Sequence, residues 1–431
     1  MNSSLTVEPL PTPFYADQVL YQALVLGHSA APRLTAWRFN GWEAETLSWK
    51  KGCYIHAGLS NTGPVSIKGP DAERYLQGLV INSFAKFPVG TMKHAVACRN
   101  DGMIAAHGIV ERKAVDEFES YASFLGMPAG PVPFDVRIEV LSQYLFQIAG
   151  PTSLDVLEKV TGESLRDIGF LTFRETRVAG LRTEIARIGM SGNLAFELHG
   201  PIEDGAKIYD AVCRAGAEFG IERLGWGSYL VNHVEGGFPQ ATWTFVPAPP
   251  GGDAAPDPLL QQHRFSGSVD PADLRARMRT PVEVRWHTMA RFDHDFVGRE
   301  ALRREMDDPR RTTVTLRWNA EDVMDIHASL LRKGPAYKPI DLPYAPNTWP
   351  QAHADHVLAG GRRVGVSSGT IYSHHFREVL SMGCLDLAHA DLGTEVIVQW
   401  GDHGGRIKDV RATVERFPYF AEDRNSAVDL A

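Results

Sequence analysis

The chain has 431 residues, enough for two or three domains, and its 44% hydrophobic and 22% charged residues are typical of a folded globular protein. A formal net charge of −8 argues against non-specific binding to nucleic acid. The cysteines lie far apart and form no Cys-x-x-Cys pair, so we expect neither a disulfide framework nor a metal site built on them.

Residues 1–50 predict a helix-rich lead-in whose tryptophans, Trp37, Trp42 and Trp49, contribute to a core. This region lacks the basic and apolar parts of a signal peptide. No apolar run in the chain approaches the roughly 20 residues that cross a bilayer. We therefore expect a cytoplasmic protein that contacts no membrane.

A unit of strand, Gly-Pro turn and helix occurs twice in the chain. The first copy covers residues 65–77, where Asp71 begins the helix, and the second covers residues 140–160. Between them, residues 94–112 alternate around an Asn-Asp-Gly turn, which predicts a β-hairpin. The repeated unit indicates a duplicated α+β core.

The second half of the chain is rich in strand patterns. Residues 171–174 and 181–188 predict strands, and residues 206–219 have helical periodicity. Pro/Gly-rich residues 126–135 predict a loop, and residues 247–258 predict a linker or a loop over the site. Short strand patterns separated by turn signals begin at residues 312, 362, 392 and 411. They predict a C-terminal β-barrel or jelly-roll.

Residues 224–239 contain several polar side chains that could take part in binding or catalysis. They are Tyr229, Asn232, His233 and Glu235. A phenol, an amide, an imidazole and a carboxylate can together bind and deprotonate a phenol or another polar substrate. The alternative is a helix C-terminus closed by glycine, with these polar groups on its wet face.

This stretch resembles a segment of the glycine-cleavage T-protein (aminomethyltransferase) superfamily. It is most similar to the Tyr-x-x-Asn-x-x-Glu-x-Gly-aromatic pattern of tetrahydrofolate-dependent vanillate and 3-O-methylgallate O-demethylases, matched here from Tyr229 to Phe238. Residues 189–198 resemble the family motif that ends in Phe/Val-Glu-Ile, and residues 292–302 resemble its F-x-G-R-E-A-L segment.

The resemblance runs in family order through residues 50–420. It implies a T-protein-like α+β core of two interleaved subdomains over residues 1–280, followed by a β-barrel domain over residues 290–431. It also implies tetrahydrofolate as the cofactor.

The resemblance further implies roles for individual side chains. Glu197 matches the glutamate that hydrogen-bonds the pterin ring, and Phe238 is assigned to the same cofactor site. Tyr229 matches a tyrosine that contacts the substrate phenol. His107 stands where relatives carry an acid, so we expect it to face the same phenol oxygen as a general base with a pH-rate limb near pH ~6.5. The residues assigned to substrate binding are His56, Asn61, Asn232 and His233.

Each assignment has a structural alternative. Glu197 could be a surface glutamate that ends a strand, and Tyr229 a half-buried aromatic residue on a helix. His107 could be a neutral, hydrogen-bonded residue that fills space, and a lone histidine such as His56 is more often structural.

The chain also departs from the family pattern. His107 replaces one of a pair of aspartates, and Gly227 replaces the arginine of the family's LG-x-R segment. Gly58 and Asn61 stand where vanillate-type enzymes use polar substrate-binding residues, and their carboxylate-binding arginine has no counterpart in a shortened loop near residues 120–135. These changes disfavour a vanillate-like benzoic acid and favour a larger or uncharged aromatic substrate.

Together, these features favour an enzyme that removes a one-carbon unit from a methoxylated, lignin-type phenol and transfers it to tetrahydrofolate. Methyl transfer requires that the leaving phenolate be stabilised and that the acceptor nitrogen lie in line. One alternative is a folate-independent lyase that releases formaldehyde from a hydroxymethyl group of a lignin-derived dimer. Another is a non-catalytic folate-binding module. The expected partner is a small aromatic substrate, and a homodimer is left open as the assembly.

Overall fold

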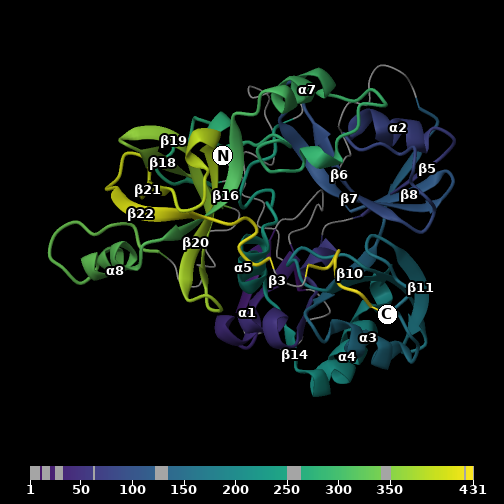
Figure 1. Ribbon diagram of the computed structural model, residues 1–431. Coiled ribbons are helices and arrows are strands. Elements are labelled where there is room, and N and C mark those ends of the chain that lie inside the picture. The colour runs from purple at the N-terminus through teal and green to yellow at the C-terminus, as the bar shows by residue number, and fades with distance from the viewer. Residues whose placement is uncertain are drawn as a thin grey trace, which may run out of the picture.

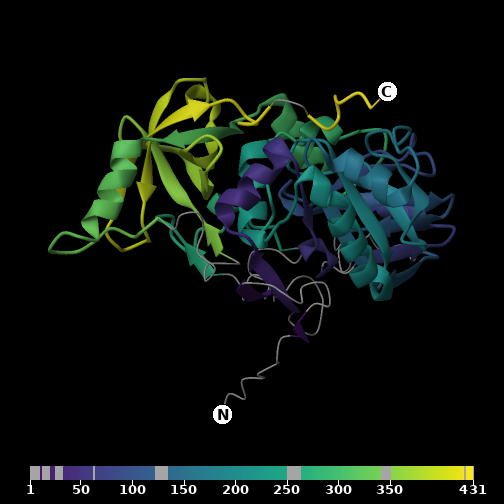
Figure 2. The same cartoon turned by 90° about the horizontal axis from the view of Figure 1, so that it is seen from below.

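The computed structural model describes residues 10–11, 20–24, 33–61, 64–121, 134–249, 264–340, 351–421 and 424–430. Figure 1 shows a closed barrel on the left and two helix-backed sheets one above the other on the right, with α5 (Trp226–Gly236) near the middle. Figure 2 shows α1 (Trp42–Lys51) between the barrel and the two sheets. No helix in the described part is long and apolar enough to cross a membrane.

The N-terminal segment corrects one prediction. Its described residues form a three-stranded sheet in the order β1-β3-β2, followed by α1, and not a helix-rich lead-in. The strands are β1 (Leu10–Pro11), β2 (Leu20–Leu24) and β3 (Arg33–Arg38). Pairing between β2 and β3 overrides the weak local helix signal. Trp37 and Trp49 are buried, as predicted, whereas Trp42 is only half-buried.

The upper sheet in Figure 1 has five antiparallel strands in the order β6-β7-β8-β5-β9, packed on α2 (Ala72–Leu79). Its strands are β5 (Val65–Lys68), β6 (Met92–Cys98), β7 (Ile104–Ala114), β8 (Glu117–Ser120) and β9 (Arg137–Val140). The predicted hairpin is confirmed, because β6 and β7 pair around residues 99–103.

The lower sheet has six strands in the order β11-β12-β13-β10-β4-β14. They are β4 (Cys53–His56), β10 (Gln143–Ala149), β11 (Phe173–Val178), β12 (Leu181–Ala186), β13 (Ala195–Pro201) and β14 (Ile221–Arg223). One face is apolar and forms the core with α3 (Ser153–Thr161) and α4 (Gly205–Gly216). Because side chains alternate along a strand, the opposite face carries a different set of residues, and it is this face that meets α5.

The duplicated strand, Gly-Pro and helix unit is confirmed as β5–α2 and β10–α3. Both turns need glycine, because Gly69 and Gly150 have φ values of 136° and 128°. An added Cβ would lie 2.3 Å from a backbone oxygen at both positions, Asp135 O and Gly52 O respectively. Each turn therefore brings its helix back against a neighbouring segment at close range.

The C-terminal region forms the predicted β-barrel, closed in the order β16-β20-β19-β18-β21-β22. Its strands are β16 (Arg311–Trp318), β18 (Asp355–Ala359), β19 (Arg362–Ser373), β20 (Glu378–Asp386), β21 (Glu395–Trp400) and β22 (Lys408–Glu415). Outside the barrel lie α7 (Arg299–Asp307), α8 (Ala320–Ser329) and the pair β15 (Arg264–Ser266) and β17 (Gln351–His353).

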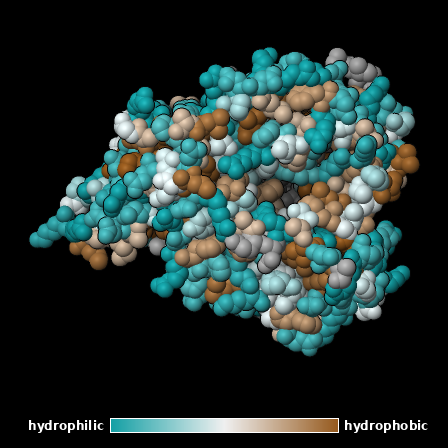
Figure 3. Space-filling view, in the orientation of Figure 1, coloured by the Kyte–Doolittle hydropathy of each residue, from teal (hydrophilic) through white to brown (hydrophobic). Residues whose placement is uncertain are grey.

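The protein surface is hollowed near the middle of the face seen in Figure 3, between the two sheets. The predicted loops at residues 126–135 and 247–258 fall mostly outside the described residues.

Candidate active site

Helix α5 carries the polar stretch, and all eleven of its residues are buried. The alternative of a wet polar face is therefore wrong. Gly237 caps the C-terminus of the helix with a φ of 68°, and an added Cβ at this position would lie 2.7 Å from Pro418 Cβ. Glu235 ties α5 to its surroundings, since it accepts hydrogen bonds from Ser373 Oγ at 2.6 Å and Trp49 Nε1 at 3.1 Å. It also forms an ion pair with Lys50 at 3.1 Å.

A chain of buried hydrogen bonds joins α5 to the lower sheet. Asn232 Nδ2 donates to Tyr54 Oη at 3.1 Å, and Tyr54 donates to Gln147 Oε1 at 2.6 Å. Gln147 Nε2 donates in turn to Glu197 Oε1 at 3.1 Å. Gln147 pairs directly with Glu197 across β10 and β13, so their side chains share one face of the sheet. Glu197 is buried on this face and is not a surface residue that ends a strand.

Tyr229 lies over the same face. Its ring stacks on His56, with centroids 4.0 Å apart and an interplanar angle of 10°, and its hydroxyl lies 3.7 Å from Met190 Sδ. The tyrosine is fully buried and not half-buried. Burial raises the pKa of Tyr229 well above its ordinary value and lowers the pKa of His56 to about 3. At neutral pH the pair is therefore a neutral phenol on a neutral imidazole.

His107 lies in a neighbouring aromatic region. Its Nδ1 is 3.2 Å from His94 Nε2, and its ring contacts Phe238, Phe245 and Trp286 at centroid distances of 6.0, 5.9 and 4.7 Å. Burial, with repulsion from neighbouring histidines, holds the pKa of His107 well below 6.5. A neutral His107 ring is therefore expected at pH 6.5, and its role toward a substrate stays a prediction.

The remaining assigned residues are distributed around these two regions. The His233 ring lies 4.5 Å from the Tyr229 ring and 5.8 Å from the Phe238 ring, so it separates Tyr229 from the region of His107. His233 Nδ1 bonds the Tyr229 carbonyl oxygen at 2.8 Å. Asn61 ends the 3₁₀ turn Gly58–Asn61, and its side chain lies outside the described residues. Tyr229 and His107 thus lie in regions that His233 and Phe238 join, and their contact with one phenol oxygen stays a prediction.

Sequence reasoning missed the groups that link these residues. Tyr54 and Gln147 connect Asn232 to Glu197, and Trp286 packs against His107. A long-range register aligns His56 with Gln147 across β4 and β10, and no local pattern reports such a register.

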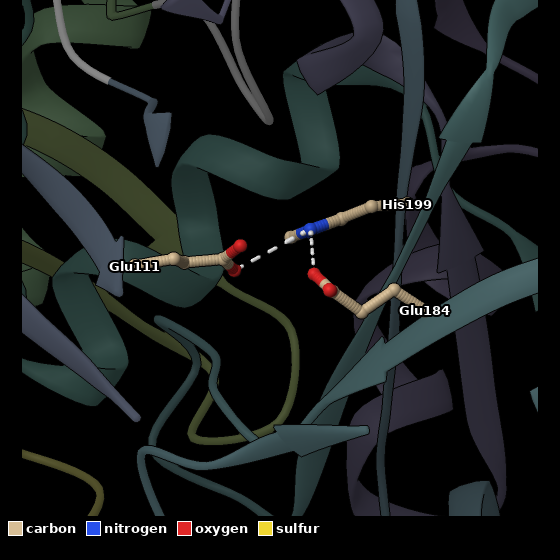
Figure 4. Close-up of side chains that lie close together, drawn as sticks. All are labelled: Glu111, Glu184 and His199. Atoms are coloured by element: carbon tan, nitrogen blue, oxygen red, sulfur yellow. Dashed lines mark ion pairs between the residues drawn. The ribbon is translucent and has the colours of Figure 1, made fainter. Parts of the chain in front are cut away.

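An ion network lies beyond Glu197, where the two sheets meet. Figure 4 shows the His199 ring close to the carboxylates of Glu111 and Glu184. A ring nitrogen of His199 and one carboxylate oxygen from each glutamate all lie within 4.8 Å of one another. Lys113 Nζ is 3.5 Å from Glu111 Oε2 and also pairs with Glu184, so an ammonium already supplies positive charge here. We therefore describe the cluster as an ion network and not as a metal centre. A cavity of about 610 Å³ borders it, lined in part by Lys113, Glu184 and His199.

The chain is similar to several known proteins over most of its length. The chain is 38% identical to the sesamin methylene transferase of Sinomonas sp. (strain No.22), over 91% of this chain and 92% of that one. It is 27% identical to the syringate O-demethylase of Sphingobium sp. (strain NBRC 103272 / SYK-6), over 91% of each chain. The structure of glycine cleavage system aminomethyltransferase T from Bartonella henselae has the same fold, with a TM-score of 0.65, 16% identity, and coverage of 94% of this chain and 95% of that one.

The family model of the GCVT N-terminal domain matches residues 21–243, the region that holds both sheets and α5. The chain therefore belongs to the glycine-cleavage T-protein (aminomethyltransferase) superfamily, in a branch with the syringate-type O-demethylases.

Proposed function

We propose that this chain transfers a one-carbon group from an ether oxygen of an uncharged aromatic substrate to tetrahydrofolate. The observation that carries the proposal is the polar sheet face, where the buried Glu197 carboxylate is linked by Gln147, Tyr54 and Asn232 to the helix that bears Tyr229. Relatives named for a methylene transferase and an O-demethylase support this reaction class, because methylene and methyl groups are both one-carbon units.

The buried polar atoms on this face fit a ligand with several N–H and C=O groups, such as a pterin ring. A carboxylate such as that of Glu197 can accept two neighbouring N–H groups. Among the described residues, no hydrogen-bond partner reaches the buried atoms Asn232 Oδ1 and His56 Nε2, whereas buried polar atoms are normally paired. Glu197 and Asn232 would hold the pterin. Tetrahydrofolate, when bound, supplies the amine nitrogen that accepts the one-carbon unit.

Tyr229 is suited to stabilise the oxygen that leaves. Its raised pKa keeps the hydroxyl protonated, so it can donate a hydrogen bond to a phenolate as the C–O bond breaks. The nearby Met190 sulfur, at 3.7 Å, is a weak acceptor and competes poorly for that proton.

The surroundings favour an uncharged substrate. The aromatic wall of Phe238, Phe245 and Trp286 includes His107, which stays neutral. Position 227 has no room for the family arginine, because an added Cβ would lie 2.9 Å from Trp37 Nε1. Position 227 therefore supplies no positive charge to the site. Methoxyphenols and methylenedioxyphenyl compounds without a carboxylate fit these walls.

Turnover of a substrate panel tests the proposal. The panel contains methoxyphenols, methylenedioxyphenyl compounds and the matching benzoic acids, each incubated with and without tetrahydrofolate and followed by mass spectrometry. We expect loss of one carbon from the uncharged compounds only when tetrahydrofolate is present. Release of formaldehyde at the same rate without folate would contradict the proposal and support the lyase.

A further inference from the structure

His199 lies between three buried carboxylates. Its Nδ1 is 3.3 Å from Glu184 Oε1 and 3.5 Å from Glu111 Oε1, and its Nε2 is 3.4 Å from Glu197 Oε2. A neutral imidazole carries hydrogen on one nitrogen and could serve only one side of the ring. The doubly protonated imidazolium donates on both sides, and it therefore fits this geometry.

The surroundings of His199 come from both sheets. The titratable groups that face it are Glu111 and Lys113 on β7, Glu119 on β8, Tyr121, Glu184 on β12 and Glu197 on β13. Burial alone disfavours a charged ring, but attraction to Glu111 and hydrogen bonds to Glu184 and Glu197 raise the pKa of His199 to about 10. Burial and the neighbouring Glu184 raise the pKa of Glu111 well above its ordinary value, whereas the bonds of Glu184 to His199 and Lys113 outweigh burial and lower the pKa of Glu184. The ionised carboxylate that faces His199 Nδ1 is therefore Glu184.

Glu197 is held on both of its oxygens. Gln147 donates to Oε1 at 3.1 Å, and His199 faces Oε2 at 3.4 Å. Glu197 and His199 are two residues apart on β13, so both point to the same side of the sheet. These two contacts fix the orientation of the Glu197 carboxylate, and therefore the direction of its remaining lone pairs.

We propose that His199 is a positioning residue that holds Glu197 as an oriented carboxylate for the pterin ring, and that Glu111 and Glu184 hold His199 in place. The proposal rests on the assignment of Glu197 to folate binding above. Removal of the imidazolium takes away the group that faces Glu197 Oε2 and leaves Lys113, which pairs with Glu111 and Glu184, as the remaining cation of the cluster. The Glu197 side chain then loses one of its two anchors. A displaced carboxylate accepts the paired N–H groups of a pterin poorly.

The arrangement also couples folate binding to the junction between the sheets. Glu111 comes from the upper sheet, whereas Glu184, Glu197 and His199 come from the lower one. The bordering cavity of about 610 Å³ is lined by Glu184 and His199, so protons can exchange with His199 from that side.

The test compares tetrahydrofolate binding by calorimetry, under anaerobic conditions, in the full-length protein and in the variants His199→Gln, Glu111→Gln and His403→Gln. The last is the matched control, since His403 is exposed at the barrel. We expect His199→Gln to weaken binding 10-fold or more and His403→Gln to leave it unchanged. In turnover, KM for tetrahydrofolate should rise in His199→Gln while KM for the aromatic substrate stays within 2-fold.

Nitrogen-15 NMR of labelled histidine in the unsubstituted protein supplies a readout that depends neither on activity nor on the folding of a variant. In the unsubstituted protein, His199 should carry protons on both ring nitrogens at pH 8, and in Glu111→Gln it should lose one at lower pH. Folate affinity of Glu111→Gln should begin to fall at the same lower pH. A neutral His199 ring at pH 8, or equal folate affinity in His199→Gln and the unsubstituted protein, would overturn the inference. Absence of folate binding by the unsubstituted protein would instead overturn the proposed function.

Discussion

Removal of the Tyr229 hydroxyl should lower turnover strongly while changing the stability of the folded state little. Tyr229→Phe keeps the ring that stacks on His56 at 4.0 Å and deletes an oxygen that lies 3.7 Å from Met190 Sδ. Because a thioether is a weak acceptor, we expect the folded state to lose less than about 1 kcal/mol. If the hydroxyl donates to the departing phenolate, its loss should lower kcat by about 10²–10³-fold, the effect of removing one oxyanion donor.

The assay is steady-state turnover of an uncharged aromatic ether with tetrahydrofolate, together with thermal unfolding. The control is Tyr209→Phe, which deletes the same atom from a tyrosine of the apolar core on the other face of the lower sheet. We expect the control to retain near-full activity. Near-full activity of Tyr229→Phe, or a loss shared equally by Tyr209→Phe, would refute the role given to Tyr229.

Four further outcomes are expected. Glu197→Ala should weaken tetrahydrofolate binding by about 1–3 kcal/mol in calorimetry, whereas the control Glu395→Ala on the barrel should leave it unchanged. Equal folate affinity of Glu197→Ala and the unsubstituted protein would remove Glu197 from the site. His107→Ala should lower turnover but should not change the shape of the pH-rate profile near pH ~6.5, because the ring is already neutral there. Loss of a limb near this pH in the variant would show that the ring titrates there. Glu235→Gln should destabilise the protein by about 3–5 kcal/mol in urea unfolding, because it removes the carboxylate that forms a buried ion pair with Lys50. A loss no larger than that of Glu395→Gln would contradict the anchoring role. Unfolding free energy should fall as the pH drops below ~6.5, because burial lowers the pKa of His94 and His233 to about 4 and only the unfolded state takes up these protons. It should also fall as the pH rises from ~6.5 toward 10, because the unfolded state loses the His199 proton that the folded state retains up to a pKa of about 10. A flat profile from pH 4 to 10 would refute both effects.

Local patterns predicted the elements that depend on neighbours in sequence. The hairpin β6–β7 and both strand, Gly-Pro and helix units follow from turn residues and short periodicities. The same hairpin register could also have placed His94 and His107 on one face of the sheet. Ile109 lies opposite His94 and Val96 lies opposite His107, so the two histidines are diagonal neighbours. Alternation along β13 likewise places Glu197 and His199 on one face.

Long-range pairing explains what the sequence left open. Gln147 reaches Glu197 and Tyr54 only because β10 lies between β13 and β4, strands that are far apart in the chain. The strands of residues 10–38 were missed because their pairing is decided by tertiary context more than by propensity. The neutrality of His107 depends on burial, which its position in the sequence does not report.

The most direct test of the central claim follows the transferred carbon itself. A methoxyphenol or methylenedioxyphenyl substrate carrying carbon-13 in its ether carbon is mixed with stoichiometric protein and tetrahydrofolate, and the label is followed by NMR in a single turnover. The account predicts that the label appears on a folate nitrogen as the phenol or catechol is released. Label appearing as free formaldehyde, with phenol release unaffected by omission of tetrahydrofolate, would contradict it.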